Sequence, residues 1–70
     1  MQYEYSINVG NIGEFILYDI AGDEISRYRL SEGDGNILKI SDAALKNGVY
    51  FYRTIINGQV EDKNKIVIIK

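Results

Sequence analysis

The alternation of apolar and polar residues along the chain is typical of β-strands. Apolar residues at every second position predict a half-buried strand over residues 3–9 that ends at Gly10. Residues 15–20 are apolar on both faces, as expected of an inner strand of a sandwich. Residues 24–30 alternate weakly and predict a more exposed strand. Between these two strands, Gly22 marks a tight turn because glycine tolerates a positive φ.

The middle of the chain mixes turn-forming and apolar residues. Residues 31–36 have the composition of a loop, and residues 37–40 predict a short strand. A polar cap, a short apolar run and Gly48 predict one helical turn over residues 41–48. Because so short a helix is unstable alone, we expect Leu45 to pack it against the core.

The pair Asn57-Gly58 is the strongest local signal, because it favours the type I′ turn of a two-residue β-hairpin. This turn predicts a register with Ile55 opposite Val60, Arg53 opposite Asp62, Tyr52 opposite Lys63 and Val49 opposite Ile66. The pair of Arg53 and Asp62 would then contribute about 0.2–1 kcal/mol. The apolar run 66–69 completes the hairpin as a terminal strand, with Lys65 and Lys70 on either side limiting aggregation.

Together these elements predict an all-β fold: a small antiparallel immunoglobulin-like β-sandwich of six to seven short strands. The 70 residues form a single domain, with no linker and no internal repeat.

Composition narrows the function classes. The chain has no Cys, His, Pro or Trp, so disulfides, ordinary zinc sites and most nucleophile–base pairs are excluded. A net charge of −2 disfavours nucleic-acid binding, and no apolar run exceeds four residues, which excludes a membrane-spanning segment. We expect a domain that is not an enzyme and needs no cofactor or metal.

Three local patterns have a functional and a structural interpretation. The ten Asp and Glu residues could supply a catalytic pair, but their turn and surface positions favour solvated carboxylates. Residues 32–36 resemble part of a calcium loop without its closing Glu, so a polar loop is favoured. Tyr3 and Tyr5 could stack nucleic-acid bases, but they flank Glu4, which favours core packing with hydroxyls at the rim.

Four blocks of sequence, in order from about Gly13 to Lys70, resemble a known family. The closing blocks are GVYFYR at 48–53 and KIVIIK at 65–70, with the turn at Gly58 between them; LYDIAGDEI at 17–25 and ILKIS at 37–41 precede them. Together they strongly resemble the type A C-terminal sorting domain of the type IX (Por) secretion system. The LYDIAGDEI block is similar to the VYDxxGxxV hairpin of that family.

The resemblance implies a module of Bacteroidota-type bacteria that catalyses nothing and acts as a secretion address. A cargo domain would lie upstream, and the folded module would be recognised from the periplasm by the outer-membrane translocon. A surface sortase commonly removes such a module, leaving the cargo secreted or at the cell surface.

The resemblance also assigns roles to single residues. Gly48, Tyr50 and Arg53 match the recurrent strand motif, and Lys65 and Lys70 match the basic residues of the last strand. Of these, Gly48 and Tyr50 are expected to be structural, and the three basic residues are candidates for contact with the translocon. Gly22 matches a turn glycine of the family. Asn57 and Gly58 are expected to form the closing turn.

The chain departs from the family pattern at its start, because it has no Pro and therefore no PNP opening segment. Loss of a first strand would leave an unpaired sheet edge, which predicts a homodimer by edge pairing or strand exchange. The alternative function is an immunoglobulin-like adhesion or spacer module of a multidomain surface protein. Such a module would lie inside its chain, whereas a sorting module ends it.

Overall fold

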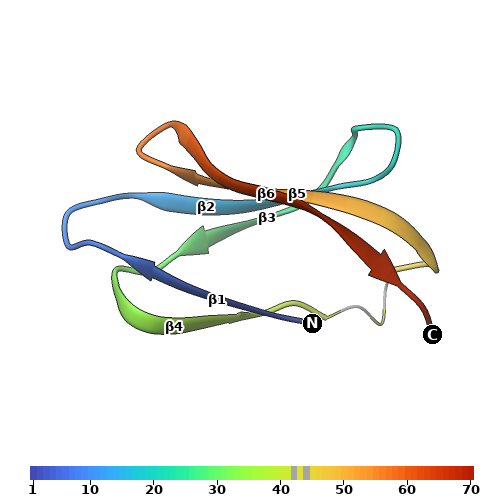
Figure 1. Cartoon of the computed structure of the whole chain (residues 1–70), viewed down its shortest axis with the longest axis horizontal. Coiled ribbons are helices and arrows are strands. Elements are labelled where there is room, and N and C mark those ends of the chain that lie inside the picture. The colour runs from blue at the N-terminus through green and yellow to red at the C-terminus, as the bar shows by residue number, and fades with distance from the viewer. Residues whose placement is uncertain (42, 44) are drawn as a thin grey trace.

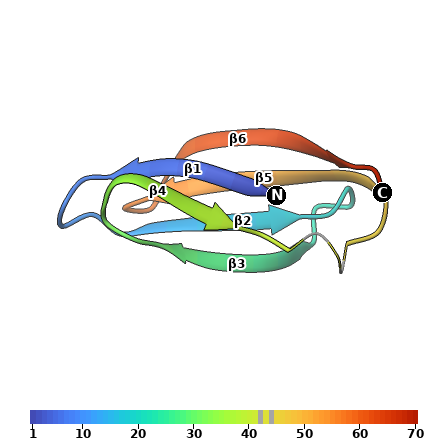
Figure 2. The same ribbon diagram turned by 90° about the horizontal axis from the view of Figure 1, so that it is seen from below.

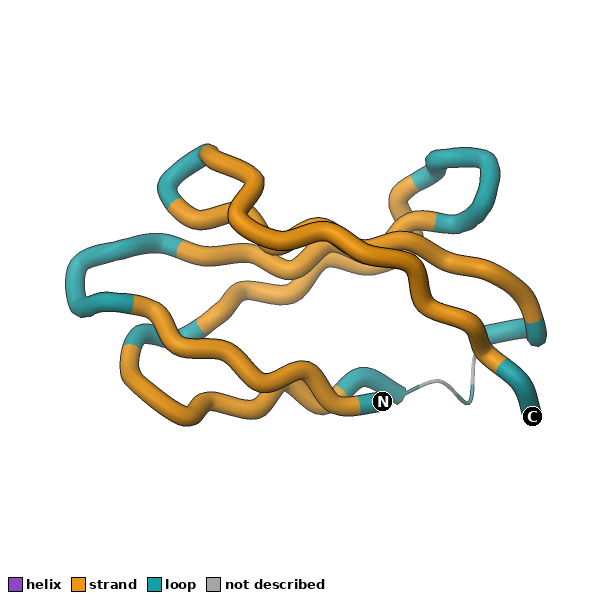
Figure 3. The backbone as a smooth tube through the Cα atoms, viewed as in Figure 1, coloured by secondary structure: helices purple, strands orange, loops and turns teal. Residues whose placement is uncertain are grey.

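The computed structural model describes residues 1–41, 43 and 45–70, and within them all regular structure is β-strand. In Figure 3 the described residues are drawn as strands, turns and loops. The strands are β1 (Gln2–Ile7), β2 (Gly13–Tyr18), β3 (Glu24–Leu30), β4 (Gly33–Lys39), β5 (Gly48–Ile56) and β6 (Gln59–Ile68). No helix in this part of the chain is long and apolar enough to cross a membrane.

The strands form two antiparallel sheets that lie face to face. One sheet has the order β3-β2-β5-β6, and the other is the pair β1-β4. Figure 1 shows the four-stranded sheet above the two-stranded one, and Figure 2 shows the same layers from below. The all-β prediction is confirmed, and two packed antiparallel sheets are consistent with an immunoglobulin-like sandwich.

The core lies between the sheets and takes side chains from both. Its buried residues are Ile7, Phe15, Leu17, Leu30, Ile40, Tyr50 and Ile68. Leu45 packs against this core, as expected from the sequence. Phe51, in contrast, is 41% exposed, because the alternation of β5 turns it to the outer face.

Aromatic rings join the two sheets at the centre of the sandwich. The ring of Phe15 lies 4.9 Å from the ring of Tyr3 and stacks on Tyr52 at 5.0 Å between centroids. Tyr3 and Tyr52 also meet edge to face at 5.4 Å. Tyr3 and Tyr5 are therefore packing residues with their hydroxyls at the rim, as predicted.

Two predicted strands end earlier than expected. β1 stops at Ile7 because the chain turns there, with Gly10 at φ 90° and Val9 86% exposed instead of buried. β2 covers residues 13–18, and Ile20 is 72% exposed in the following turn. In both cases a local turn takes an apolar residue out of the sheet, although the sequence pattern had assigned this residue to a strand.

The loop predicted over residues 31–36 is wrong from Gly33 onward, because β4 begins there and pairs with β1. Gly33 and Gly35 have positive φ values and lie beside a shift in the β1–β4 register. The side-chain amide of Asn36 donates to the carbonyls of Ser31, Glu32 and Gly33 at 3.0–3.2 Å. The backbone oxygens of this segment therefore accept hydrogen bonds from the Asn36 side chain. The described residues contain no cluster of three or more acidic side chains that could hold a metal ion.

The predicted helical turn over residues 41–48 includes positions 42 and 44, which lie outside the described residues. Gly48 does not follow a helix in the described part of the chain. It begins β5, with a φ of 154°.

The closing hairpin has the predicted turn but a different register. Asn57 and Gly58 both have positive φ, 49° and 82°, as a type I′ turn requires, and Ile55 faces Val60. A β-bulge at Glu61 then shifts the pairing by one residue. The pairs beyond the bulge are Thr54–Asp62, Arg53–Lys63, Tyr52–Asn64 and Val49–Val67, so the predicted pairs of Arg53, Tyr52 and Val49 are wrong.

Candidate functional site

A shallow groove lies over β5 and β6 on the outer face of the four-stranded sheet. Its volume is about 480 Å³. We call it the β5–β6 groove; its lining residues are Tyr18, Gly22, Phe51, Tyr52, Arg53, Lys63, Asn64 and Lys65. Three of these carry positive charge and none carries negative charge, so the groove is basic although the whole chain has a net charge of −2.

Strand register explains why these side chains gather. On β5 and β6, Phe51 lies opposite Lys65, and Arg53 lies opposite Lys63. Residues opposite one another in a sheet point to the same face, so the four side chains form one array on the outer surface. The guanidinium of Arg53 lies 5.3 Å from the ring centroid of Tyr18 on β2, which extends the array to a third strand.

The inner face of the same hairpin carries a polar network that depends on the bulge. Tyr3 and Tyr52 both donate a hydrogen bond to Oδ2 of Asp62 at 3.0 Å. The buried Thr54 donates to the hydroxyl of Tyr3 at 2.7 Å. Because Tyr3 is on β1 and the other three residues are on β5 and β6, the network ties the two sheets together.

The tyrosines of this network resist ionisation. Burial is the main cause that raises the pKa of Tyr52 to about 12, and the hydrogen bond to Asp62 adds to it. Burial also raises the pKa of Tyr3, and the Asp62 carboxylate acts in the same direction. A phenolate at either position would lie against a carboxylate.

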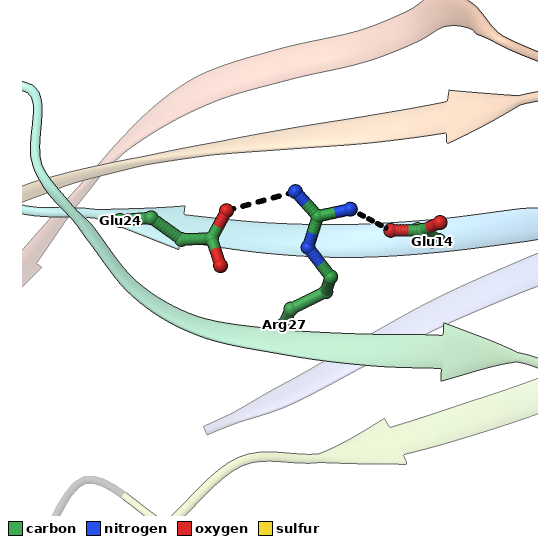
Figure 4. Close-up of polar contacts among 3 residues, drawn as sticks. All are labelled: Glu14, Glu24 and Arg27. Carbon is green, nitrogen blue, oxygen red and sulfur yellow. Dashed lines mark hydrogen bonds and ion pairs between the residues drawn. The ribbon is translucent and has the colours of Figure 1, made fainter.

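A separate charged cluster occupies the β2–β3 side of the outer face. Figure 4 shows Arg27 between two carboxylates, with 2.6 Å to Glu14 and 2.9 Å to Glu24. The hydrogen bond from Arg27 lowers the pKa of Glu24, and the two carboxylates raise the pKa of Arg27. All three side chains are substantially exposed, so solvent and salt screen these pairs. Each charged group of this cluster has an oppositely charged partner, which the basic residues of the β5–β6 groove do not have among the described residues.

The structure brings together two of the five predicted recognition residues. Arg53 and Lys65 both line the groove, and both are exposed. Tyr50 is buried on the opposite face of β5 and donates to the carbonyl of Lys46 at 2.6 Å. Gly48 begins β5 outside the groove.

Lys70 lies beyond the end of β6, outside the groove. Its backbone N–H donates to Oδ1 of Asn47 at 2.9 Å, and its ammonium donates to the carbonyl of Ala43 at 2.9 Å. These bonds attach the end of β6 to the segment before β5.

The predicted turn residues are all in turns. Gly22 has a φ of 89° and donates to the carbonyl of Asp19 at 3.0 Å in the β2–β3 turn. The side chain of Asn57 accepts from the N–H of Ile12 at 2.9 Å and donates to Asn11 at 3.0 Å. The closing turn is therefore anchored to the β1–β2 connection.

Sequence reasoning missed five lining residues, namely Tyr18, Phe51, Tyr52, Lys63 and Asn64. Alternation on β5 places Phe51 on the same face as Arg53, so that signal was present. Lys63 could not be assigned to this face without the bulge, because the unbulged register turns it to the other side.

A comparison with protein families finds a match over nearly the whole chain. The family model of the secretion system C-terminal sorting domain matches residues 2–70. The chain belongs to this family. No curated protein and no solved structure matches it. The sorting-domain match spans all six strands, so the groove and the inner-face network are both parts of the sorting domain.

Proposed function

We propose that this domain is a non-catalytic address that directs a cargo protein, attached upstream, across the outer membrane through the type IX secretion translocon. The family match over residues 2–70 is the observation that carries the proposal. The cargo reaches the periplasm by a signal of its own, and the folded domain is then recognised as a shape. The exported protein is secreted or held at the cell surface.

The recognition surface in this proposal is the closing hairpin. Arg53 and Lys65 are exposed side chains on β5 and β6 that can contact the translocon directly. Tyr50 and Gly48 act indirectly, since one packs in the core and the other starts β5. Lys70 is the third basic contact, placed where the end of β6 meets the preceding segment.

Surface processing completes the proposed sequence of events. A sortase on the cell surface removes the domain from its cargo after export. The match to the sorting-domain family supports this step.

The proposal is tested with a reporter enzyme that carries an N-terminal export signal and ends in residues 1–70, expressed in a type IX-competent bacterium. Deleting residues 65–70 would be a poor probe, because Ile68 is in the core and the domain would unfold. Lys65→Gln and Lys70→Ala change only exposed side chains. Both should shift reporter from the medium to the periplasm.

Lys39→Gln on β4 is the matched control, since it removes the same charge from the other sheet and should not change export. Reporter that stays in the periplasm with the intact domain would refute the proposal and favour a spacer or adhesion module.

A further inference from the structure

The β5–β6 groove contains a pair of like charges on neighbouring strands. Arg53 and Lys63 lie directly opposite each other, and like charges in this position destabilise a sheet. Among the described residues, neither side chain forms an ion pair. Without the bulge at Glu61, Arg53 would face Asp62 and its charge would be balanced.

The bulge thus has two effects on the hairpin. It turns Asp62 inward, where two tyrosines bind it, and it places Lys63 on the outer face beside Arg53. Bulges are common where a strand must re-aim a side chain, and local violations of pairing rules concentrate at functional sites. The uncompensated positive charge therefore indicates an anionic partner.

The spacing of the charges indicates the shape of that partner. Lys63 and Lys65 are two residues apart on one strand, which places them roughly 6.5–7 Å apart along β6. Alternate side chains of any extended peptide have the same spacing. Phe51 lies opposite Lys65 with 41% of its surface exposed, and offers an apolar contact beside the charges.

The edge of the sheet favours a polypeptide over other anions. β6 pairs only with β5 in the described part of the chain, so its outer backbone groups face no strand. An extended peptide can use such groups as an added strand, whereas a polysaccharide or a nucleic acid cannot continue the ladder. The chain's net charge of −2 also opposes attraction of a polyanion to the molecule as a whole.

We propose that the β5–β6 groove binds an extended acidic segment of a protein partner along β6, with its carboxylates at Arg53, Lys63 and Lys65 and an apolar side chain against Phe51. This inference rests on the proposed function, because the acidic segment is taken to belong to the export machinery. It adds the chemistry of the partner and the residue Lys63.

The first test measures binding in vitro by NMR, with the isotope-labelled domain attached to its reporter. The probe is a peptide of about ten residues in which Glu alternates with Thr, and its Gln-for-Glu counterpart is the control. We expect amide shifts centred on residues 51–53 and 63–65 with the Glu peptide only, weakening as salt rises from about 50 to about 500 mM. Shifts of equal size with both peptides would overturn the proposal.

Variants then assign the binding to the named charges. Lys63→Gln and Lys65→Gln should each weaken binding about twofold to fivefold, as expected for exposed charge pairs, and Lys39→Gln should not. Lys63→Glu should abolish binding while the domain stays folded, because it replaces a like-charge pair with an opposite one. Unchanged binding in Lys63→Glu would contradict the proposal. So would tighter binding of an oligouronate or of single-stranded DNA to the same residues.

The export assay separates this inference from the proposed function. If the intact domain exports the reporter, the double variant Lys63→Gln, Lys65→Gln should reduce export and Lys39→Gln should not. Full export by a double variant that no longer binds the peptide would overturn the inference and leave the sorting function intact. Failure of the intact domain to export would refute the sorting function, while the peptide titration would still decide the chemistry of the groove.

Discussion

The shared carboxylate of Asp62 gives the sharpest prediction about the fold. Asp62→Ala removes the acceptor of two tyrosine hydroxyls, each at 3.0 Å. A hydrogen bond contributes about 0.5–1.5 kcal/mol net, and this carboxylate is exposed to solvent, so the two together should stabilise the domain by about 1–2 kcal/mol. A single core of this size supplies about 3–5 kcal/mol, so the loss is a large share of the total.

The assay is equilibrium unfolding in urea, followed by tyrosine fluorescence and circular dichroism. The unfolding equilibrium constant of Asp62→Ala should rise about 5- to 30-fold. The matched control is Glu61→Ala, which removes the neighbouring carboxylate from the exposed bulge position and should change stability little.

Double-mutant cycles distinguish this network from the register that the hairpin turn alone predicts. Asp62→Ala should couple to Tyr52→Phe by about 0.5–1.5 kcal/mol and should not couple to Arg53→Gln. Coupling to Arg53 with none to Tyr52 would show that the hairpin lacks the bulge. The account of both the inner network and the outer groove would then be refuted.

Four further predictions concern stability and assembly. Gly13→Ala should destabilise the domain by about 1–3 kcal/mol, because its Cβ would clash with Cδ1 of Ile7 and lie 3.2 Å from Cβ of Leu30 in a buried site; chemical denaturation measures this, and an unchanged midpoint would contradict it. The raised pKa of Tyr52, about 12, predicts full stability below pH 10 and a loss as the pH rises from 10 to 12, because the unfolded chain releases its proton first; Tyr52→Phe should flatten that part of the pH profile. Lys63→Glu should raise the free energy of unfolding by up to about 1 kcal/mol, because it places a negative charge opposite Arg53 on the neighbouring strand. A lower melting temperature in this variant would show that Arg53 and Lys63 do not repel each other. Open strand edges in both sheets predict a homodimer by edge pairing or strand exchange, which light scattering would disprove if the mass stayed monomeric over a wide concentration range.

The fold was predictable because its determinants are local. Alternation predicted β1 and β3, a run of apolar residues predicted β2, and Asn57-Gly58 set the closing turn, since only residues that tolerate positive φ fit a type I′ turn. The start of β4 was missed because Gly33 and Gly35 have the composition of a loop, and only pairing with β1 makes that segment a strand.

The candidate site was predictable only in part, because it depends on register. Arg53 and Lys65 could be identified from a motif, but their neighbour Lys63 depends on one extra residue in β6. A bulge is not set by the turn sequence. The bulge lets Asp62 accept hydrogen bonds from Tyr3 and Tyr52. Tyr3 is far from Asp62 in the sequence, and Tyr52 faces a different residue in the register that the turn predicts.

The most direct test of the central claim compares two strains that express the same reporter ending in residues 1–70. One strain has a working type IX translocon and the other lacks it. The account predicts reporter outside the outer membrane in the first strain and folded reporter confined to the periplasm in the second. Equal amounts outside both strains, or none outside either, would contradict the assignment of this domain as a type IX export signal.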